Sequence, residues 1–138
     1  MAQRRPKYVE IEENNGTVLR YLHHSQGGGL VEQSAEVDSA AYVDESAYVD
    51  GGARVEPGAW IGTGAWVDHG ALVRERAHVG TAAHIGRDAV IGRDARIGAR
   101  AKVGAGACIE DGVRIEPDSV IPAGALVSRR GRIRPTAA

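Results

Sequence analysis

The sequence predicts an all-β solenoid, and three observations support this fold class. From Val31 the chain repeats one six-residue unit seventeen times without an insertion or deletion. The first position of every unit is Val or Ile, and fourteen of the seventeen fifth positions are Ala. Side chains alternate with a period of two along a strand and 3.6 along a helix, so a period of six keeps these apolar positions on one face only in strands.

The composition agrees with a solenoid rather than with a layered domain. The chain has 138 residues, with 19 Gly, two Trp, four Tyr and no Phe. A chain with so few large side chains cannot fill an ordinary layered core. We therefore expect a thin interior filled by stacked Val, Ile and Ala.

Each six-residue unit is expected to form one short strand and one corner. The Ala at position five and the next Val or Ile face the interior, and positions six and two face outward. Positions three and four turn the corner, where residues that tolerate a left-handed backbone are favoured. Position four holds ten such residues: Gly52, Gly58, Gly64, Gly70, Gly106, Gly112, Gly124, Asp88, Asp94 and Asp118.

The N-terminal segment differs from the repeats. Tyr8–Ile11 and Thr17–Leu22 have strand-like composition, and the Asn-Asn-Gly at 14–16 between them favours a hairpin turn. We expect this hairpin to cap the open end of the solenoid, because an uncapped end exposes unpaired backbone. The His- and Gly-rich stretch 23–29 is predicted to be a flexible connection.

The predicted organisation has three parts. Residues 1–30 form the hairpin cap and the Gly-rich connection, residues 31–133 form the repeat solenoid, and residues 134–138 form a short C-terminal tail. The charge is uneven, since residues 1–70 carry a net −6 and residues 71–138 a net +5. Such a charge dipole suggests head-to-tail stacking into filaments, which the cap and tail are expected to block.

The sequence favours a soluble, cytoplasmic protein without membrane contact. No run approaches the roughly 20 apolar residues that cross a bilayer, and the first residues lack the apolar middle of a secretory signal. The one cysteine, Cys108, can form no internal disulfide and is expected to be a plain small side chain. The Arg-rich end at 129–134 is interpreted as a solvated tail, so nucleic-acid binding is not expected.

The repeat resembles the hexapeptide-repeat family, whose chains coil as a left-handed parallel β-helix with eighteen residues per turn. The resemblance covers Val31 to about Ile133 and implies five to six triangular coils. Members of this family are typically trimers with sites between subunits, which implies a homotrimer here. The predicted hairpin followed by Gly28–Glu32 also resembles a group of uncharacterised bacterial and prophage repeat proteins, which usually have Trp or Phe where this chain has Leu30.

A spacing of eighteen residues predicts three outward columns of position-six side chains. The first contains Tyr42, Trp60, His78, Arg96, Arg114 and Arg132. The second contains Tyr48, Trp66, His84, Lys102 and Val120. The third contains Glu36, Arg54, Leu72, Val90, Cys108 and Leu126.

Two interpretations of these columns remain open. Two columns pass from Tyr to Trp to His to a cation, and such ladders support neighbouring strands by roughly 0.2–1 kcal/mol per pair. Alternatively, these planar side chains line a cleft between subunits that holds a small molecule or a partner. The third column ends in an apolar stripe that we expect to contact another subunit. The cleft residues would be Tyr42, Tyr48, Trp60, Trp66, His78 and His84, and the stripe Leu72, Val90, Cys108 and Leu126.

The family resemblance also implies a candidate reaction. Its largest activity class transfers an acyl group from a CoA thioester, with a histidine as general base. Asp68-His69-Gly70 resembles the Asp-His-Gly of serine acetyltransferases, so His69 would be the base and Asp68 its orienting carboxylate. In that family extra residues interrupt the coil, and a C-terminal segment helps cover the cofactor. Here the next unit follows without interruption.

A metal site is not predicted. Some family members are zinc carbonic anhydrases with His ligands from two subunits, and zinc catalysis needs three converging protein ligands and a water. His78 and His84 are expected on different faces of one prism, and the motifs of that enzyme family are absent.

The sequence thus favours a non-enzymatic trimeric scaffold or binding protein, of phage-related origin and without a cofactor. The alternative is an acyl-CoA-dependent O- or N-acyltransferase with His69 as general base. The unbroken repeat favours the first, because enzymes usually need a loop that excludes water from the reacting groups.

Overall fold

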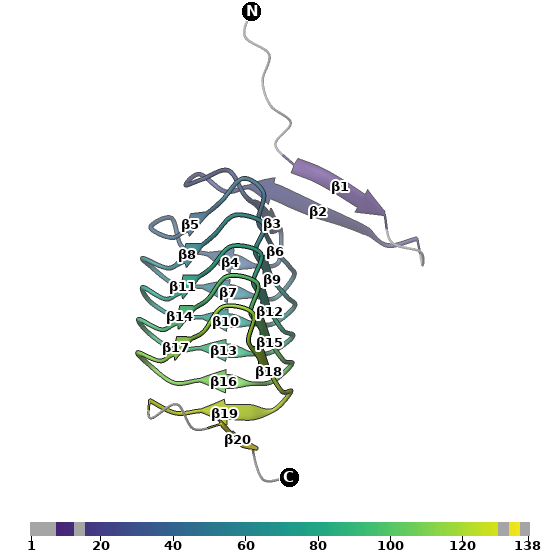
Figure 1. Cartoon of the computed structure of the whole chain (residues 1–138). Helices are drawn as coiled ribbons and strands as arrows, with labels where there is room; N and C mark the ends of the chain where they lie inside the picture. The colour runs from purple at the N-terminus through teal and green to yellow at the C-terminus, as the bar shows by residue number, and fades with distance from the viewer. Residues whose placement is uncertain (1–7, 13–15, 130–132, 136–138) are drawn as a thin grey trace, which may run out of the picture.

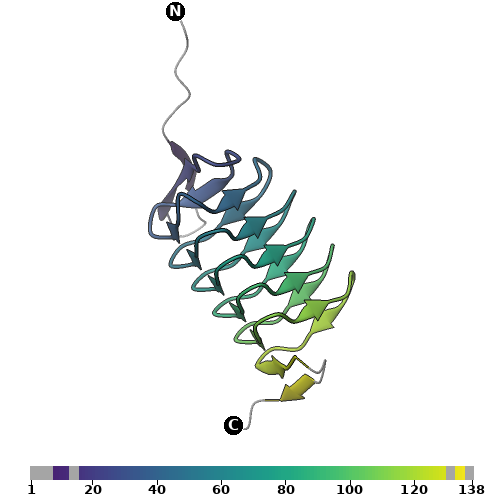
Figure 2. The same cartoon turned by 90° about the vertical axis from the view of Figure 1, so that its left-hand side faces the viewer.

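The computed structural model describes residues 8–12, 16–129 and 133–135, and in these segments it consists of strands and turns. The coils stack along one axis, with β1 and β20 at opposite ends (Figures 1 and 2). Over the described segments, no helix is present that could cross a membrane. The predicted all-β solenoid is confirmed, while its left-handed sense stays a prediction.

The strands form three sheets. Sheet 1 has the order β1 (Tyr8–Glu12), β2 (Val18–His23), β3 (Leu30–Glu32), β6 (Tyr48–Val49), β9 (Trp66–Val67), β12 (His84–Ile85), β15 (Lys102–Val103) and β18 (Val120–Ile121). Sheet 2 has the order β20 (Ile133–Pro135), β19 (Ala125–Val127), β16 (Cys108–Ile109), β13 (Val90–Ile91), β10 (Leu72–Val73), β7 (Arg54–Val55) and β4 (Glu36–Val37). Sheet 3 has the order β17 (Arg114–Ile115), β14 (Arg96–Ile97), β11 (His78–Val79), β8 (Trp60–Ile61) and β5 (Tyr42–Val43).

The chain visits the sheets in the order 2, 3, 1, so each coil contributes one strand to each sheet. Neighbouring coil strands are parallel and pair residues eighteen apart, such as Tyr48 with Trp66 and Trp66 with His84. The position-one Val and Ile and the position-five Ala form one continuous buried core. Each buried Val or Ile contributes roughly 1.5–3 kcal/mol of apolar burial, so the repeat itself supplies the stability of the coil.

The corners depend on a left-handed residue at position four. Every sixth residue from Gly52 to Gly124 has a positive φ, as the sequence predicted for its Gly and Asp residues. Three further residues at this position, which the sequence argument did not single out, share the conformation: Arg76, Ala82 and Arg100, with φ of 59°, 57° and 60°. For residues with a Cβ this conformation costs about 1–2 kcal/mol.

We expect Ala82→Gly to stabilise the fold. Glycine removes the left-handed strain, and the greater freedom of the unfolded chain offsets part of the gain, which leaves about 0.5–1 kcal/mol. The measurement is the urea midpoint of unfolding followed by circular dichroism. Ala83→Gly is the control, because Ala83 is a buried core residue whose loss should lower the midpoint. A lower midpoint for Ala82→Gly would contradict the strain assigned to this corner.

The N-terminal strands form the predicted hairpin, with β1 antiparallel to β2 from Tyr8↔Leu22 to Glu12↔Val18. The predicted turn includes residues 13–15, which lie outside the described residues. Strand β2 also pairs antiparallel with β3, which places Tyr21 opposite Glu32 at the edge of the first coil. The hairpin therefore extends sheet 1 and brings a side chain from outside the repeat onto the solenoid.

The segment between the hairpin and the repeat is not the free connection that the sequence predicted. The Gly29 N–H donates to the Val43 carbonyl at 2.9 Å, and the Val43 N–H donates to the Gln26 carbonyl at 3.0 Å. Gly27 has φ +96°, and a Cβ there would collide with the Val43 carbonyl oxygen. The glycines are needed because this segment lies directly along the outer edge of β5.

The C-terminal end also contains a strand. β20 pairs antiparallel with β19, from Ala125↔Pro135 to Val127↔Ile133. The tail predicted to start at residue 134 therefore begins inside a strand. Arg132, the predicted last member of the first outward column, lies outside the described residues.

Candidate functional site

The column on sheet 3 forms a stacked ladder that ends in two cations. The Tyr42 and Trp60 ring centroids lie 4.0 Å apart, and those of Trp60 and His78 lie 6.1 Å apart with the planes nearly parallel. Trp60 is 44% exposed. Arg96 and Arg114 continue the column in register on β14 and β17. The ladder thus leads from aromatic rings to guanidinium groups along one face.

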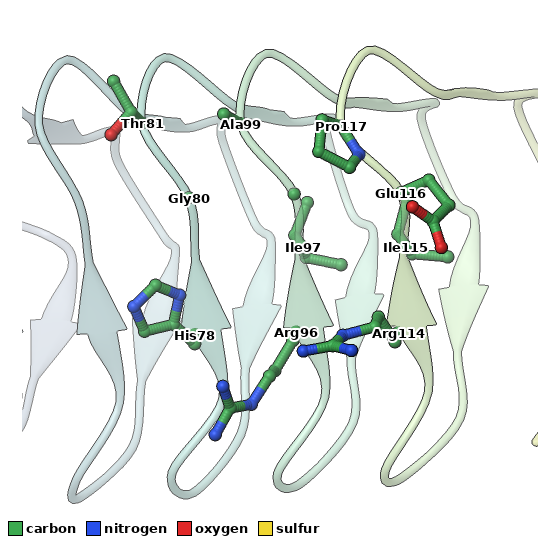
Figure 3. Close-up of a pocket in the computed structure, with 11 residues that line it drawn as sticks. His78, Gly80, Thr81, Arg96, Ile97, Ala99, Arg114, Ile115, Glu116 and Pro117 are labelled. Atoms are coloured by element: carbon green, nitrogen blue, oxygen red, sulfur yellow. The ribbon is translucent and has the colours of Figure 1, made fainter.

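The cationic end of this ladder lines an open trough of about 480 Å³. Figure 3 shows His78, Arg96 and Arg114 along one side of the trough, with Thr81, Ala99 and Pro117 on the corner that follows sheet 3. Over the part of the chain that the structure describes, neither guanidinium forms an ion pair. Like charges in register repel each other, so the trough is suited to an anion that would neutralise them.

Protonation of His78 is disfavoured on this surface. Burial, and then the nearby Arg96 guanidinium, lower the pKa of His78 below its ordinary value. The folded protein therefore favours neutral His78, and the unfolded chain binds more protons once the pH falls below about 6.5. As the pH falls from about 6.5 toward the folded pKa of His78, this residue lowers the free energy of unfolding. Above about pH 6.5 it has no such effect.

This sign predicts a pH-dependent difference between the wild type and His78→Gln. The wild-type Tm is expected to fall more steeply between pH 7.5 and pH 5.5 than the Tm of the variant, which lacks the titrating ring. Thermal unfolding in steps of 0.5 pH unit measures both slopes. Parallel Tm curves would contradict the lowered pKa.

The column on sheet 1 forms a second ladder with an additional polar contact. The Tyr48 and Trp66 ring centroids lie 5.6 Å apart, and those of Trp66 and His84 lie 4.0 Å apart. The indole N–H of Trp66 donates to Oδ2 of Asp50 at 2.6 Å. This ladder is therefore tied to a carboxylate, whereas the sheet 3 ladder ends in cations.

Asp50 links the repeat to the N-terminal hairpin. Its side chain is only 6% exposed, and its Oδ1 accepts a hydrogen bond from the Tyr21 hydroxyl at 2.7 Å. Burial, and then this hydrogen bond, raise the pKa of Tyr21, so its hydroxyl keeps its proton and acts as a donor. The sequence argument did not identify either residue as part of a site. Asp50 precedes Asp68 by eighteen residues, which is one coil. The spacing of these two aspartates could therefore have predicted that they lie in neighbouring coils at the same corner.

Asp68 and His69 lie at the corner between β9 and β10. Oδ1 of Asp68 accepts from the His69 backbone N–H at 2.7 Å and contacts His69 Nδ1 at 2.9 Å. Oδ2 of Asp68 contacts His84 Nε2 at 3.1 Å. Burial alone would raise the pKa of Asp68, but the hydrogen bonds from His69 and His84 hold that pKa below its ordinary value.

The ionised carboxylate fixes the position of the imidazole protons. Because a carboxylate only accepts hydrogen bonds, Nδ1 of His69 and Nε2 of His84 must carry the protons. The lone pair of neutral His69 is then on Nε2, which has no hydrogen-bond partner among the described residues. The His69 side chain is 42% exposed, while that of Asp68 is 14% exposed. The two predicted catalytic residues thus form a dyad that presents a basic nitrogen at the surface.

Ligand atoms of Asp50, Asp68 and His69 lie within 4.8 Å of one another, close enough to share a cation. Both oxygens of Asp50 already accept from Tyr21 and Trp66, and both oxygens of Asp68 from the two imidazoles. A cation bound through His69 Nδ1 would have to displace the proton that this nitrogen donates to Asp68. The arrangement therefore favours proton transfer at this cluster.

The predicted apolar stripe lies in register along sheet 2. Leu72, Val90, Cys108 and Leu126 are all half-buried, and their contact with another subunit stays a prediction. Burial, and then two nearby carboxylates, raise the pKa of the Cys108 thiol. This thiol therefore stays protonated and is a poor nucleophile, in keeping with a plain small side chain.

The dyad and the trough lie on different sides of the solenoid. His69 is at the corner where sheet 1 passes into sheet 2, and the trough lies on sheet 3 and the corner that follows it. In a three-sided coil, the His69 corner between sheets 1 and 2 is opposite sheet 3 (Figure 1). One chain alone therefore does not bring the trough and the basic nitrogen of His69 together.

Comparison with known proteins identifies a related enzyme structure. No family model matches the chain, and no curated protein matches it in sequence. The structure is similar to a mutant GDP-perosamine N-acetyltransferase from Caulobacter crescentus in complex with CoA and GDP-perosamine, with a TM-score of 0.70 and 31% identity. The similarity covers 72% of this chain and 47% of that enzyme, so the chain spans about half the length of its relative.

Two further structures superpose less closely. A hexapeptide transferase family protein from Anaplasma phagocytophilum is 14% identical, with a TM-score of 0.45 and 75% of each chain covered. An acetyltransferase domain from Neisseria gonorrhoeae in complex with acetyl coenzyme A is 24% identical, with a TM-score of 0.30, covering 67% of this chain and 53% of that one.

The comparison corrects two predictions. It supports the acyltransferase alternative better than the non-enzymatic scaffold. It also contradicts the prediction that no cofactor is used, because the similar enzyme was crystallised with CoA. The unbroken register does not prevent polar side chains from converging, since Asp50, Asp68 and His69 lie together without any inserted loop and His84 contacts Asp68 from the next coil. The repeat, the stacked parallel sheets and this similarity together make the chain a member of the hexapeptide-repeat β-helix superfamily.

Proposed function

We propose that this protein is an acyltransferase that uses an acyl-CoA donor and a hydroxyl or amine acceptor, with His69 as general base. The observation that carries the proposal is the 2.9 Å contact between Asp68 Oδ1 and His69 Nδ1, which leaves Nε2 exposed as the basic atom. A base oriented in this way contributes roughly 10²–10⁴-fold to the rate of proton-coupled attack.

The reaction follows from this geometry. The acceptor oxygen or nitrogen attacks the thioester carbonyl carbon as His69 Nε2 takes the acceptor proton. The tetrahedral intermediate then expels the thiolate with cleavage of the C–S bond, and the proton on His69 is returned to that thiolate. Asp68 stabilises the transient imidazolium through its contact with Nδ1.

The trough on sheet 3 is suited to the phosphates of the donor. CoA carries a diphosphate and a further phosphate, and guanidinium groups bind phosphate through charge-assisted hydrogen bonds. Arg96 and Arg114 offer such groups without ion-pair partners in the described part of the chain. Because the trough is remote from His69 of the same chain, the donor would reach His69 of a neighbouring subunit. The protein would then act as a homotrimer, with the stripe on sheet 2 as a subunit contact.

Acetyl-CoA binding tests this proposal. The wild type is expected to bind acetyl-CoA in isothermal titration calorimetry, and Arg96→Ala/Arg114→Ala to bind it about 100-fold more weakly or worse, since each of two charged hydrogen bonds contributes about 1.5–3 kcal/mol net of water. Arg76→Ala/Arg93→Ala is the matched control, because it removes the same charge at the corner before sheet 3, outside the trough and away from the His69 corner. Absence of binding by the wild type at millimolar acetyl-CoA, or equal loss in both variants, would contradict it.

A further inference from the structure

Asp68 is shared between two imidazoles. One oxygen holds Nδ1 of His69 at 2.9 Å, and the other holds Nε2 of His84 at 3.1 Å. The His84 side chain is 30% exposed and comes from β12, one coil further along sheet 1. The carboxylate that orients the proposed base is thus itself held by a second titratable ring.

The ladder alone does not explain this contact. His78 occupies the equivalent place in the ladder of sheet 3, stacked on Trp60, and among the described residues it contacts no carboxylate. Stacking on a tryptophan therefore does not require a hydrogen bond from the histidine. Of the two described ladder histidines, only His84 contacts an aspartate that also binds a second histidine, which indicates a role in addition to packing.

His84 is held firmly enough to position Asp68. Its ring stacks on Trp66 with centroids 4.0 Å apart and an angle of 20° between the planes. Trp66 is in turn fixed by its 2.6 Å hydrogen bond to Asp50. With its backbone in β12 and its ring against Trp66, His84 can direct Oδ2 of Asp68 and leave Oδ1 for His69.

Other charged groups lie near this pair. Asp50 Oδ2 lies 3.8 Å from His69 Nδ1, and Lys102 is next to His84 in register on β15. The oxygens of Asp50 accept hydrogen bonds from Tyr21 and Trp66, whereas Asp68 holds His69 Nδ1 at 2.9 Å. Asp68 is therefore the carboxylate that orients His69.

We propose that His84 is a positioning residue for the base: its hydrogen bond to Oδ2 of Asp68 fixes the carboxylate so that Oδ1 holds Nδ1 of His69 and leaves Nε2 as the basic atom. This inference rests on the proposed function for its catalytic consequence, and on the geometry alone for the tautomer of His69.

The position of the His69 proton is tested by NMR of ¹⁵N-labelled histidine side chains, with the His69 signals assigned from their absence in His69→Gln. In the wild type, neutral His69 is expected to carry its proton on Nδ1. His84→Phe removes the hydrogen bond that fixes Asp68, so the Nε2–H tautomer of His69 should gain population, whereas His84→Gln should keep the wild-type tautomer because its amide still donates to Asp68. His78→Gln, which removes the other ladder histidine, should leave the His69 tautomer unchanged.

The positioning role is tested separately by kinetics. His84→Phe keeps the stack on Trp66 but loses the hydrogen bond to Asp68, so kcat should fall about tenfold or more with little change in the KM for acetyl-CoA. His84→Gln should keep kcat near the wild-type value, because its amide still donates to Asp68. The same His69 tautomer in His84→Phe and in the wild type would overturn the positioning of the dyad by His84. Equal plateau kcat in His84→Phe and wild type would overturn the positioning role. A wild type that transfers no acyl group, while His84→Phe still changes the His69 tautomer, would overturn the proposed function and leave the positioning of His69 by His84 intact.

Discussion

His69→Ala is expected to lower kcat for acyl transfer from acetyl-CoA by about 10²–10⁴-fold, the range that a well-placed general base contributes. The alanine cannot accept the acceptor proton, so attack on the thioester would depend on water as the base. The donor should still bind with wild-type affinity, because its proposed contacts lie on sheet 3. Release of the CoA thiol, followed with a thiol-reactive dye at saturating donor and acceptor, measures kcat.

Two variants separate loss of the base from loss of structure. His69 is at an exposed corner, so His69→Ala should keep the wild-type circular dichroism spectrum and nearly the same Tm. Asp68→Asn keeps a side chain of the same shape but removes the carboxylate charge, and it should lower kcat less than His69→Ala does. A kcat for His69→Ala within threefold of the wild type would show that this residue is not the base.

Most of the fold could be predicted because one local rule repeats along the chain. Val or Ile at position one and Ala at position five determine which side of every strand is buried, and the structure buries them as predicted. The corner conformation was predictable at Gly and Asp but not at Arg76, Ala82 and Arg100, where the regular coil imposes the strain. The segment along β5 was misjudged because its hydrogen bonds to Val43 are irregular and follow no period.

The candidate site was predictable only in part. The pair Asp68 and His69 is local and resembles a known motif, so sequence reasoning found it. His84 was identified as a ladder residue, but its contact with Asp68 joins positions sixteen residues apart and depends on the height and twist of one coil. Tyr21 could not be placed at all, because its contact with Asp50 depends on how the hairpin pairs with β3.

Mixed oligomers test whether the site is shared between subunits. His69→Ala chains keep an intact trough, and Arg96→Ala/Arg114→Ala chains keep an intact dyad. Each variant alone is expected to have little activity at a donor concentration below the wild-type KM. When the two chains, with different tags, are co-expressed and isolated as mixed trimers, some subunit boundaries join a trough from one variant to a base from the other.

The fraction of activity that should be recovered follows from the number of subunit boundaries that carry both intact elements. In a mixed ring of three, whichever chain is present twice, one boundary of the three carries both intact elements, so activity should rise to about a third of the wild-type value. Co-expression of His69→Ala with Asp68→Asn is the control, because both changes damage the same dyad and no boundary regains it. Since the trough and His69 are on opposite sides of one coil, recovery requires that the donor crosses from one subunit to the next. Activity no higher than the average of the two parents would place donor and base in one chain, and the proposed trimeric site would be wrong.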